Sequence, residues 1–368
     1  DLLITNLKEG SSELRQQLPK LLDELQNKDR IIMAMAGSNG TEYRLQTRES
    51  SAWFEEFRAQ EAELNGAPQR IEQQRVELFK ARFTETLKKV RISQGKDNVD
   101  RKLAVTYDST LPKDNHKNIY LWIQDGWQSN EKSVIAEANA KPTDNPTLFA
   151  FLPAQHKTDI AIAIMTLEAA RTTLQKKGIP STEVGRDAQR SMESRARNAE
   201  KELQDLLDKL FATVRVFQAG GQEVTEGSDL ADRINRAGKH SAIRLFNQFD
   251  VADNDKWGKV YDEARKGNTE ALKAVGHTQA VDKHPLCQNL LKFIGPGKKG
   301  SEIRDQFESP PFGWPRDAID GGLFALLVVG NIRATDSSNA LMTVQTLDRN
   351  KITQANFRQE TISITPAQ

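Results

Sequence analysis

An unbroken apolar stripe between residues 182 and 213 constrains the fold more than any other feature of the sequence. Small and apolar side chains recur there at steps of three and four residues, at Ala188, Met192, Ala196, Ala199, Leu203, Leu206 and Leu210. This spacing places them on one face of an α-helix of about eight to nine turns at 3.6 residues each. Thr182 and the acidic Glu183 form a helix start signal. The sequence therefore predicts a long helix with one buried face.

Strand-like and helical patterns alternate in the middle of the chain. Residues 118–127 and 146–153 are apolar runs that indicate buried strands. Helical spacing follows each of them, over residues 131–140 and 157–178. Such alternation is typical of a parallel α/β layer. We therefore predict a helix-rich α/β fold, in which long helices accompany a small strand layer.

A helix followed by two short strands is predicted near each end of the chain. Residues 11–27 have helical spacing and precede a strand–turn–strand pattern that ends near Thr47, and residues 315–347 repeat this order. Helix then hairpin is the second half of a winged-helix unit, so we expect winged-helix-like units near both ends. The expected segments are a winged-helix-like unit (1–49), a helical segment (50–100), an α/β layer with long helices (101–220), a helical region (221–299) and a second winged-helix-like unit (300–368).

Charge and cysteine content exclude several classes of protein. The 52 basic and 51 acidic residues leave a net charge of +1, which excludes a strongly basic nucleic-acid coat protein but leaves room for a local basic patch. A single cysteine, Cys287, excludes an internal disulfide framework and is consistent with the reducing cytoplasm. No apolar run reaches the length of a membrane span. We expect a cytoplasmic protein without a membrane partner.

Residues 310–315 form a rigid aromatic entry to an apolar helix. They are Pro310, Pro311, Phe312, Gly313, Trp314 and Pro315. Proline at a helix start costs no hydrogen bond, and glycine permits a tight turn. One interpretation is a packing anchor, with the two aromatic rings on the core. The other is a contact surface for DNA or a partner, with Arg316 exposed beside it.

Three stretches carry a resemblance to a known family. The run SPPFGWPRDAIDGGLFALLVVGNIRA, together with GTEYRLQTRESSAWFEEF and VIAEANAKPTDNPTLFAFLP, resembles the large P-loop proteins of bacteriophage-exclusion (BREX) systems, of the BrxC and PglY type. The resemblance covers most of the chain in order. It implies a cytoplasmic antiviral defence protein that acts with other BREX subunits, including a methyltransferase and a phosphatase-like protein. It also implies a parent protein with an ATP-binding module.

The phosphate-binding motif of that module is absent from this sequence. The nearest run, residues 295–301, has Ser301 where the motif requires lysine, and a helical pattern precedes it instead of a strand. Because the chain begins at Asp1 and not at Met, we expect a segment of a longer protein, with the ATPase module N-terminal to it. Residues 1–49 would then be the winged-helix-like end of that module. ATP and Mg²⁺ are expected there, and no cofactor is expected in this segment.

Five basic residues near the C-terminal winged-helix-like unit are candidate DNA contacts. They are Lys298, Lys299, Arg304, Arg316 and Arg333. Winged units often contact phosphates, so double-stranded DNA is a candidate partner. Such units also serve protein contacts, so a scaffold that does not touch DNA stays open. Self-association into a homo-oligomer stays open as well.

No catalytic constellation stands out in the sequence. The five histidines lack metal-ligand spacing and no cysteine cluster supports them, so no metal site is predicted. His284 and Cys287 are three residues apart, which would suit a thiol–imidazole pair, but a buried unreactive cysteine is the more common outcome of such a pattern. We therefore predict a non-catalytic segment of a BREX-type ATPase that contributes DNA binding and assembly.

Overall fold

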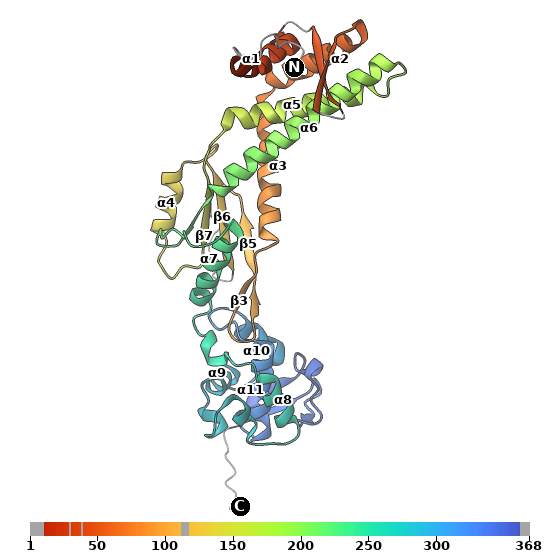
Figure 1. Cartoon of the computed structure of the whole chain (residues 1–368). Coiled ribbons are helices and arrows are strands. Elements are labelled where there is room, and N and C mark those ends of the chain that lie inside the picture. Colours follow the sequence, from red (N-terminus) through yellow and green to blue (C-terminus); the bar gives the residue numbers. More distant parts are fainter. Residues whose placement is uncertain (1–10, 29–30, 38–39, 112–117, 361–368) are drawn as a thin grey trace, which may run out of the picture. The chain divides into compact units, whose positions relative to one another are not determined.

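A computed structural model describes residues 11–28, 31–37, 40–111 and 118–360 (Figure 1). The outermost parts of the predicted units 1–49 and 300–368 therefore lie outside the described residues. Helices account for 55% of the structure and strands for 15%, which confirms the predicted helix-rich α/β class. The chain forms two compact units, one from residues 1–88 and 154–213, the other from residues 89–153 and 214–368.

The first unit is built from long helices. They are α2 (Arg48–Asn65), α3 (Pro68–Leu87), α5 (Lys157–Lys177) and α6 (Glu183–Ala212). The helices α5 and α6 form a hairpin, and both α2 and α3 pack on α5 (Figure 1). The side chain of Thr182 accepts the N–H of Gly185 at 2.9 Å and caps α6. All seven stripe residues of α6 are buried, so the helix predicted over 182–213 is confirmed.

The N-terminal hairpin belongs to this helical unit. It follows α1 (Ser11–Asp23) and the π-helical turn η1 (Glu24–Lys28), and it pairs β1 (Ile32–Gly37) with β2 (Gly40–Leu45) in antiparallel register. β1 packs on α6, where Met33 and Met35 are buried and Ser191 donates to the carbonyl of Ala34. The described part of residues 1–49 thus holds one α-helix and one hairpin. These elements pack with the long helices of the first unit.

The second unit contains the α/β layer. Its sheet has the order β5 (Leu103–Thr106), β6 (Ile119–Asp125), β7 (Leu148–Leu152), β8 (Arg215–Gln218). The first three strands are parallel and β8 is antiparallel. Trp122, Phe149 and Phe217 pack with Val134 and Ala138 of α4 (Glu131–Ala140). The helices α5 and α6, which we expected within this layer, belong to the other unit.

Helix α7 (Leu230–Leu245) packs on the sheet and on a small hairpin, and a series of short helices follows α7 in the chain. In the sheet it contacts β6, β7 and β8, and the hairpin consists of β3 (Ile92–Gln94) and β4 (Val99–Arg101). The segment 50–100, which we predicted to be helical, therefore ends in these strands. After α7 come η2 (Phe249–Ala252), α8 (Trp257–Arg265), η3 (Ala271–Val275), η4 (Val281–Lys283) and α9 (Pro285–Ile294).

The C-terminal region has the connectivity of a winged helix. It continues from α9 through β9 (Lys298–Lys299), α10 (Gly300–Glu308), α11 (Arg316–Val328), β10 (Ile332–Thr335), β11 (Leu341–Met342), η5 (Arg349–Lys351) and β12 (Asn356–Gln359). The antiparallel sheet has the order β11-β10-β12-β9, so the last strand lies between β10 and β9. The sheet includes β9, so it extends to Lys298, just before the predicted boundary at residue 300.

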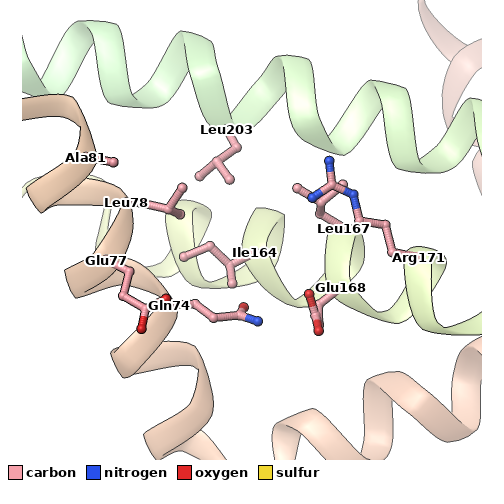
Figure 2. A pocket seen from close by; sticks show the side chains of 9 residues that line it. All are labelled: Gln74, Glu77, Leu78, Ala81, Ile164, Leu167, Glu168, Arg171 and Leu203. Carbon is pink, nitrogen blue, oxygen red and sulfur yellow. The ribbon is translucent and has the colours of Figure 1, made fainter. Parts of the chain in front are cut away.

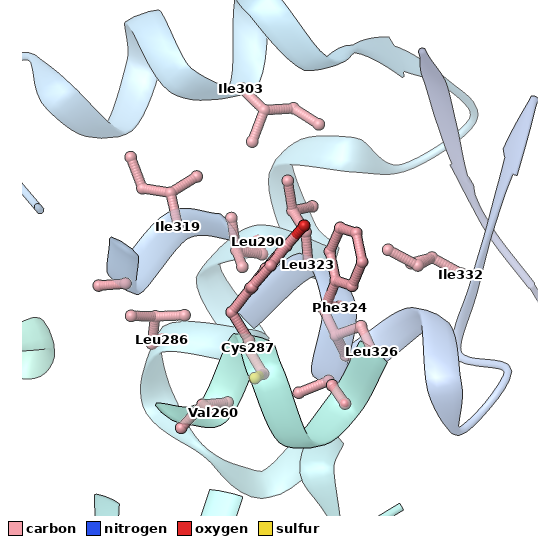
Figure 3. Close-up of a cluster of buried hydrophobic side chains, with 14 of the residues drawn as sticks. Val260, Leu286, Cys287, Leu290, Ile303, Ile319, Leu323, Phe324, Leu326 and Ile332 are labelled. Atoms are coloured by element: carbon pink, nitrogen blue, oxygen red, sulfur yellow. The ribbon is translucent and has the colours of Figure 1, made fainter. Parts of the chain in front are cut away.

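Helix α11 is enclosed in the core of this winged-helix unit (Figure 3). Its nine consecutive residues from Ala318 to Leu326 are all buried. Leu323, Phe324 and Leu326 pack with Cys287 of α9, with Val260 of α8 and with Ile303 of α10. Helix α8 packs along α11. The helix that would read bases in a DNA-binding winged helix is therefore covered by protein.

The proline–aromatic entry is a packing anchor. Trp314 is 1% exposed, and its indole N–H donates to the carbonyl of Gln248 at 2.9 Å. Its ring stacks on Phe307, with centroids 4.6 Å apart, and Phe312 meets both rings edge-on. This hydrogen bond satisfies the one polar group of a buried tryptophan. The first of the two sequence interpretations therefore describes Phe312 and Trp314.

Arg101 ties this entry to the hairpin of β3 and β4. Its guanidinium lies 3.9 Å from the ring centroid of Phe246 and donates to the carbonyl of Gly313 at 2.8 Å. Burial lowers the pKa of Arg101 to about 10. Gly313 has φ +60°, and a Cβ there would lie 2.3 Å from Cδ1 of Phe246. Only glycine fits this backbone and this contact.

Gly313→Ala should destabilise the second unit by about 2–3 kcal/mol, because positive φ and a steric overlap act together. Gly330→Ala is the matched control. Gly330 also has positive φ (+78°), but open space surrounds it, so a loss of about 1 kcal/mol is expected from backbone strain alone. Urea unfolding followed by tryptophan fluorescence measures both. Equal losses would show that the contact with Phe246 is unimportant.

His284 and Cys287 do not form a reactive pair. Cys287 is fully buried, and burial raises the pKa of its thiol far above the ordinary value. Nδ1 of His284 accepts the backbone N–H of Leu286 at 3.1 Å, which caps α9. The ring lies edge-on to Trp257, and burial together with the neighbouring His277 lowers the pKa of His284 to about 4. His284 is a structural cap.

This low pKa makes stability depend on pH. His284 binds a proton less readily in the folded state than in the unfolded state, where its pKa is near 6.5. The folded state therefore has its full stability above pH 6.5 and loses stability as the pH falls from 6.5 toward 4. His284→Asn keeps a capping side chain and removes the titration. The variant should lose less stability than the wild-type chain between pH 7 and pH 5 in urea unfolding. Parallel pH profiles for the two proteins would contradict this account.

Candidate nucleic-acid interface

The outer face of the winged-helix sheet gathers three cations. Arg333 of β10 lies directly opposite Arg358 of β12, and Lys299 of β9 lies opposite Asn356 of β12. Side chains alternate across a strand, so the buried Phe357 points inward and these three cations point outward. All three are exposed. We name Lys299, Arg333 and Arg358 the basic sheet face.

The electrostatics of the basic sheet face favour an anion. Like charges directly opposite each other on neighbouring strands are destabilising. Arg333 relieves part of this repulsion through Nε, which lies 3.1 Å from Oε1 of Glu360. A phosphate group can accept hydrogen bonds from two guanidinium groups at once, so it would relieve the repulsion between Arg333 and Arg358.

Arg304 is not part of this surface. It is 7% exposed, and its Nε and Nη2 donate to the two carboxylate oxygens of Asp320 at 3.0 and 2.9 Å. Asp320 also accepts from Nε of Arg349 at 2.8 Å. The prediction that Arg304 contacts DNA is therefore wrong for this structure, because its guanidinium is buried in an ion pair with Asp320.

Arg316 is exposed and Lys298 is half-buried, and carboxylates balance both charges. Lys298 lies 3.5 Å from Glu302 and 5.4 Å from the ring centroid of Phe293. Arg316 donates from Nε and Nη2 to Glu308 at 2.7 and 3.2 Å. Lys298 lies opposite Phe357, so its side chain is on the opposite face of the sheet from that of Lys299. Of the five predicted cations, the structure thus places Lys299 and Arg333 together.

Sequence reasoning missed Arg358. The stretch Asn356–Gln359 alternates one buried residue with exposed polar ones, which is the signal of a half-buried strand. That alternation could have placed Arg358 on an outer face. Its proximity to Arg333 could not have been read from the sequence, because these residues pair across a connection of some twenty residues.

The glycine-rich run 295–301 has no free N–H groups for a phosphate at the start of α10. The N–H of Gly300 donates to Ala355 at 2.9 Å, and the N–H of Ser301 donates to Thr353 at 3.2 Å. A Cβ at Gly300 would lie 1.8 Å from the carbonyl oxygen of Ile352. The glycine therefore serves the close approach of two backbone segments.

Comparisons with known proteins identify no relative. No family model, no curated protein and no solved structure matches the chain. Among the described residues, none of the helices has the length and apolar character needed to cross a membrane. The same residues contain no group of three or more histidine, cysteine or acidic side chains suited to a metal ion.

The buried and exposed arginines should differ sharply in their effect on stability. Arg304→Ala leaves Asp320 buried with one partner fewer and should cost about 3–5 kcal/mol. Arg316→Ala breaks an exposed pair and should cost roughly 0–1 kcal/mol. Urea unfolding of both variants tests the assignment. Similar small losses in both would mean that the ion pair inside the core contributes little.

Proposed function

We propose that this chain is a non-catalytic region of a BREX-type phage-defence ATPase, and that its winged-helix unit binds the phosphate backbone of double-stranded DNA. The resemblance of the SPPFGWPRDAIDGG stretch supports the family. The basic sheet face carries the DNA assignment, because it gathers Lys299, Arg333 and Arg358 on one exposed surface. Phosphate contacts supply most of the affinity of non-specific DNA binding.

The proposed contact is independent of base sequence. The covered helix α11 leaves no recognition helix to enter the major groove, so base edges are not read in this arrangement. The basic sheet face would contact phosphates alone, and such contacts position a protein on the duplex without specifying a site. Binding of this kind is suited to an assembly that holds DNA while another subunit acts on it.

The partners in this proposal come from the family resemblance. They are the other BREX subunits, including a methyltransferase and a phosphatase-like protein, in the cytoplasm. ATP and Mg²⁺ belong to a P-loop module that this segment does not contain. The segment would contribute a DNA contact and surfaces for assembly, while ATP hydrolysis takes place elsewhere in the parent protein.

The test is equilibrium binding to a short DNA duplex across a salt series. Substituting Lys299, Arg333 and Arg358 by Gln should weaken binding at low salt and flatten the slope of log affinity against log salt by roughly 2–3 units. The matched control substitutes Lys259 of α8, Lys266 just after α8 and Lys273 of η3, all exposed and in the same unit, by Gln. The control should keep the wild-type slope. Equal slopes in all three proteins would remove the DNA assignment.

A protein-interaction scaffold is the second candidate. The observation that favours it is the local compensation of charge, since Lys298 and Arg316 each lie beside a carboxylate. Absence of DNA binding even at low salt would support this alternative. Co-purification of defence subunits after nuclease treatment would then identify direct protein contacts.

A further inference from the structure

The first unit contains an apolar groove that the DNA proposal does not use (Figure 2). Helices α3, α5 and α6 surround it, and its volume is about 300 Å³. Leu78 from α3, Ile164 and Leu167 from α5 and Leu203 from α6 form its floor, and Ala81 lies at the α3 side. The volume of this groove is at the lower limit of typical ligand pockets. It is large enough to hold a few side chains of a bound partner.

Contacts between α3 and α6 fix the distance between the walls of the groove. Beyond its end, Phe83 of α3 packs on Phe211 of α6 with ring centroids 4.8 Å apart. Arg82 and Asp208 form an ion pair between the same two helices. Ile164, Leu167 and Leu203 are buried, so their positions are set by the packing of α5 on α6. The groove is therefore preformed, which lowers the entropic cost of binding.

The rim of the groove is acidic. Gln74 and Glu77 of α3 lie on one side, and Glu168 and Arg171 of α5 lie on the other (Figure 2). The charge of Arg171 is balanced by Glu200, whose Oε1 lies 2.8 Å from its Nη2. Among the residues that line the groove, Glu77 and Glu168 are thus the charges left to face a ligand. A complementary ligand presents an apolar side chain between positive charges.

We propose that this groove docks an amphipathic helix of a partner protein, with leucine-sized side chains inserted between α3, α5 and α6. Lysine or arginine residues that flank them would face Glu77 and Glu168. Helix-in-groove recognition uses this combination of an apolar floor and a charged rim. The charge complementarity selects a basic helix and disfavours an acidic one. The inference concerns the first unit alone and does not depend on DNA binding.

The test uses a designed helical peptide of leucine and lysine, with the leucines on one face and a fluorescent label. Fluorescence anisotropy measures its binding to the full chain, and a leucine–glutamate peptide of the same pattern is the control ligand. The wild-type chain should bind the lysine peptide at least about tenfold more tightly than the glutamate peptide. Equal affinities for the two peptides would overturn the proposal.

Two variants block the groove in different ways. Ala81→Phe adds a ring at an exposed position on the groove wall, and Glu77→Lys with Glu168→Lys reverses the rim charge. Each should weaken binding of the lysine peptide about tenfold, which is the loss expected from a blocked apolar anchor or a reversed charge pair. The control, Glu85→Lys with Asp205→Lys, changes the charge equally outside the groove lining and should bind as the wild type does. Circular dichroism establishes that each variant is folded.

Two further results would overturn the inference. One is an equal loss of binding in the charge control, which would mean that the peptide recognises the general charge of the unit. The other is a wild-type dimer that Ala81→Phe converts to a monomer in sedimentation, which would assign the groove to a second copy of this chain.

Discussion

The buried carboxylate of Asp320 organises the winged-helix unit. It lies on the enclosed helix α11 and has no exposed surface, so its charge must be paired inside the protein. Arg304 reaches it from α10, and Arg349 reaches it from the connection between β11 and β12. Three separate segments are therefore held at one point. The strands that carry Arg333 and Arg358 follow two of these segments directly, so the ion cluster also sets the position of the outer sheet face.

The enclosure of α11 changes what a winged helix can do. In a DNA-reading unit the corresponding helix is exposed, whereas here nine of its residues are buried and α8 packs along it. One face of its sheet, which carries Lys299, Arg333 and Arg358, is exposed. An exposed face with a like-charged cross-strand pair is suited to phosphate contacts, and phosphate contacts carry no base recognition.

The net charge of +1 conceals two surfaces of opposite character. The first unit has an acidic rim around an apolar groove, and the second has the basic sheet face. Charge counted over the whole chain averages these surfaces to almost zero.

The sequence by itself determined the local structure. The spacing of Ala188 through Leu210 specified α6, and alternating apolar runs specified β6 and β7, because each pattern reports which side of one element faces inward. The prolines and aromatic residues before α11 indicated an anchored helix start, and Trp314 is indeed buried there.

Only the tertiary structure decided which elements meet. It placed the N-terminal hairpin on α6, buried Arg304 against Asp320, and brought Arg358 opposite Arg333. It also produced the groove, whose lining combines α3 with the α5–α6 hairpin, two parts that lie far apart in the chain. Periodicity shows which face of an element is buried but does not show which other element packs against that face. An arginine in a buried ion pair and an arginine exposed to solvent therefore cannot be told apart in the sequence.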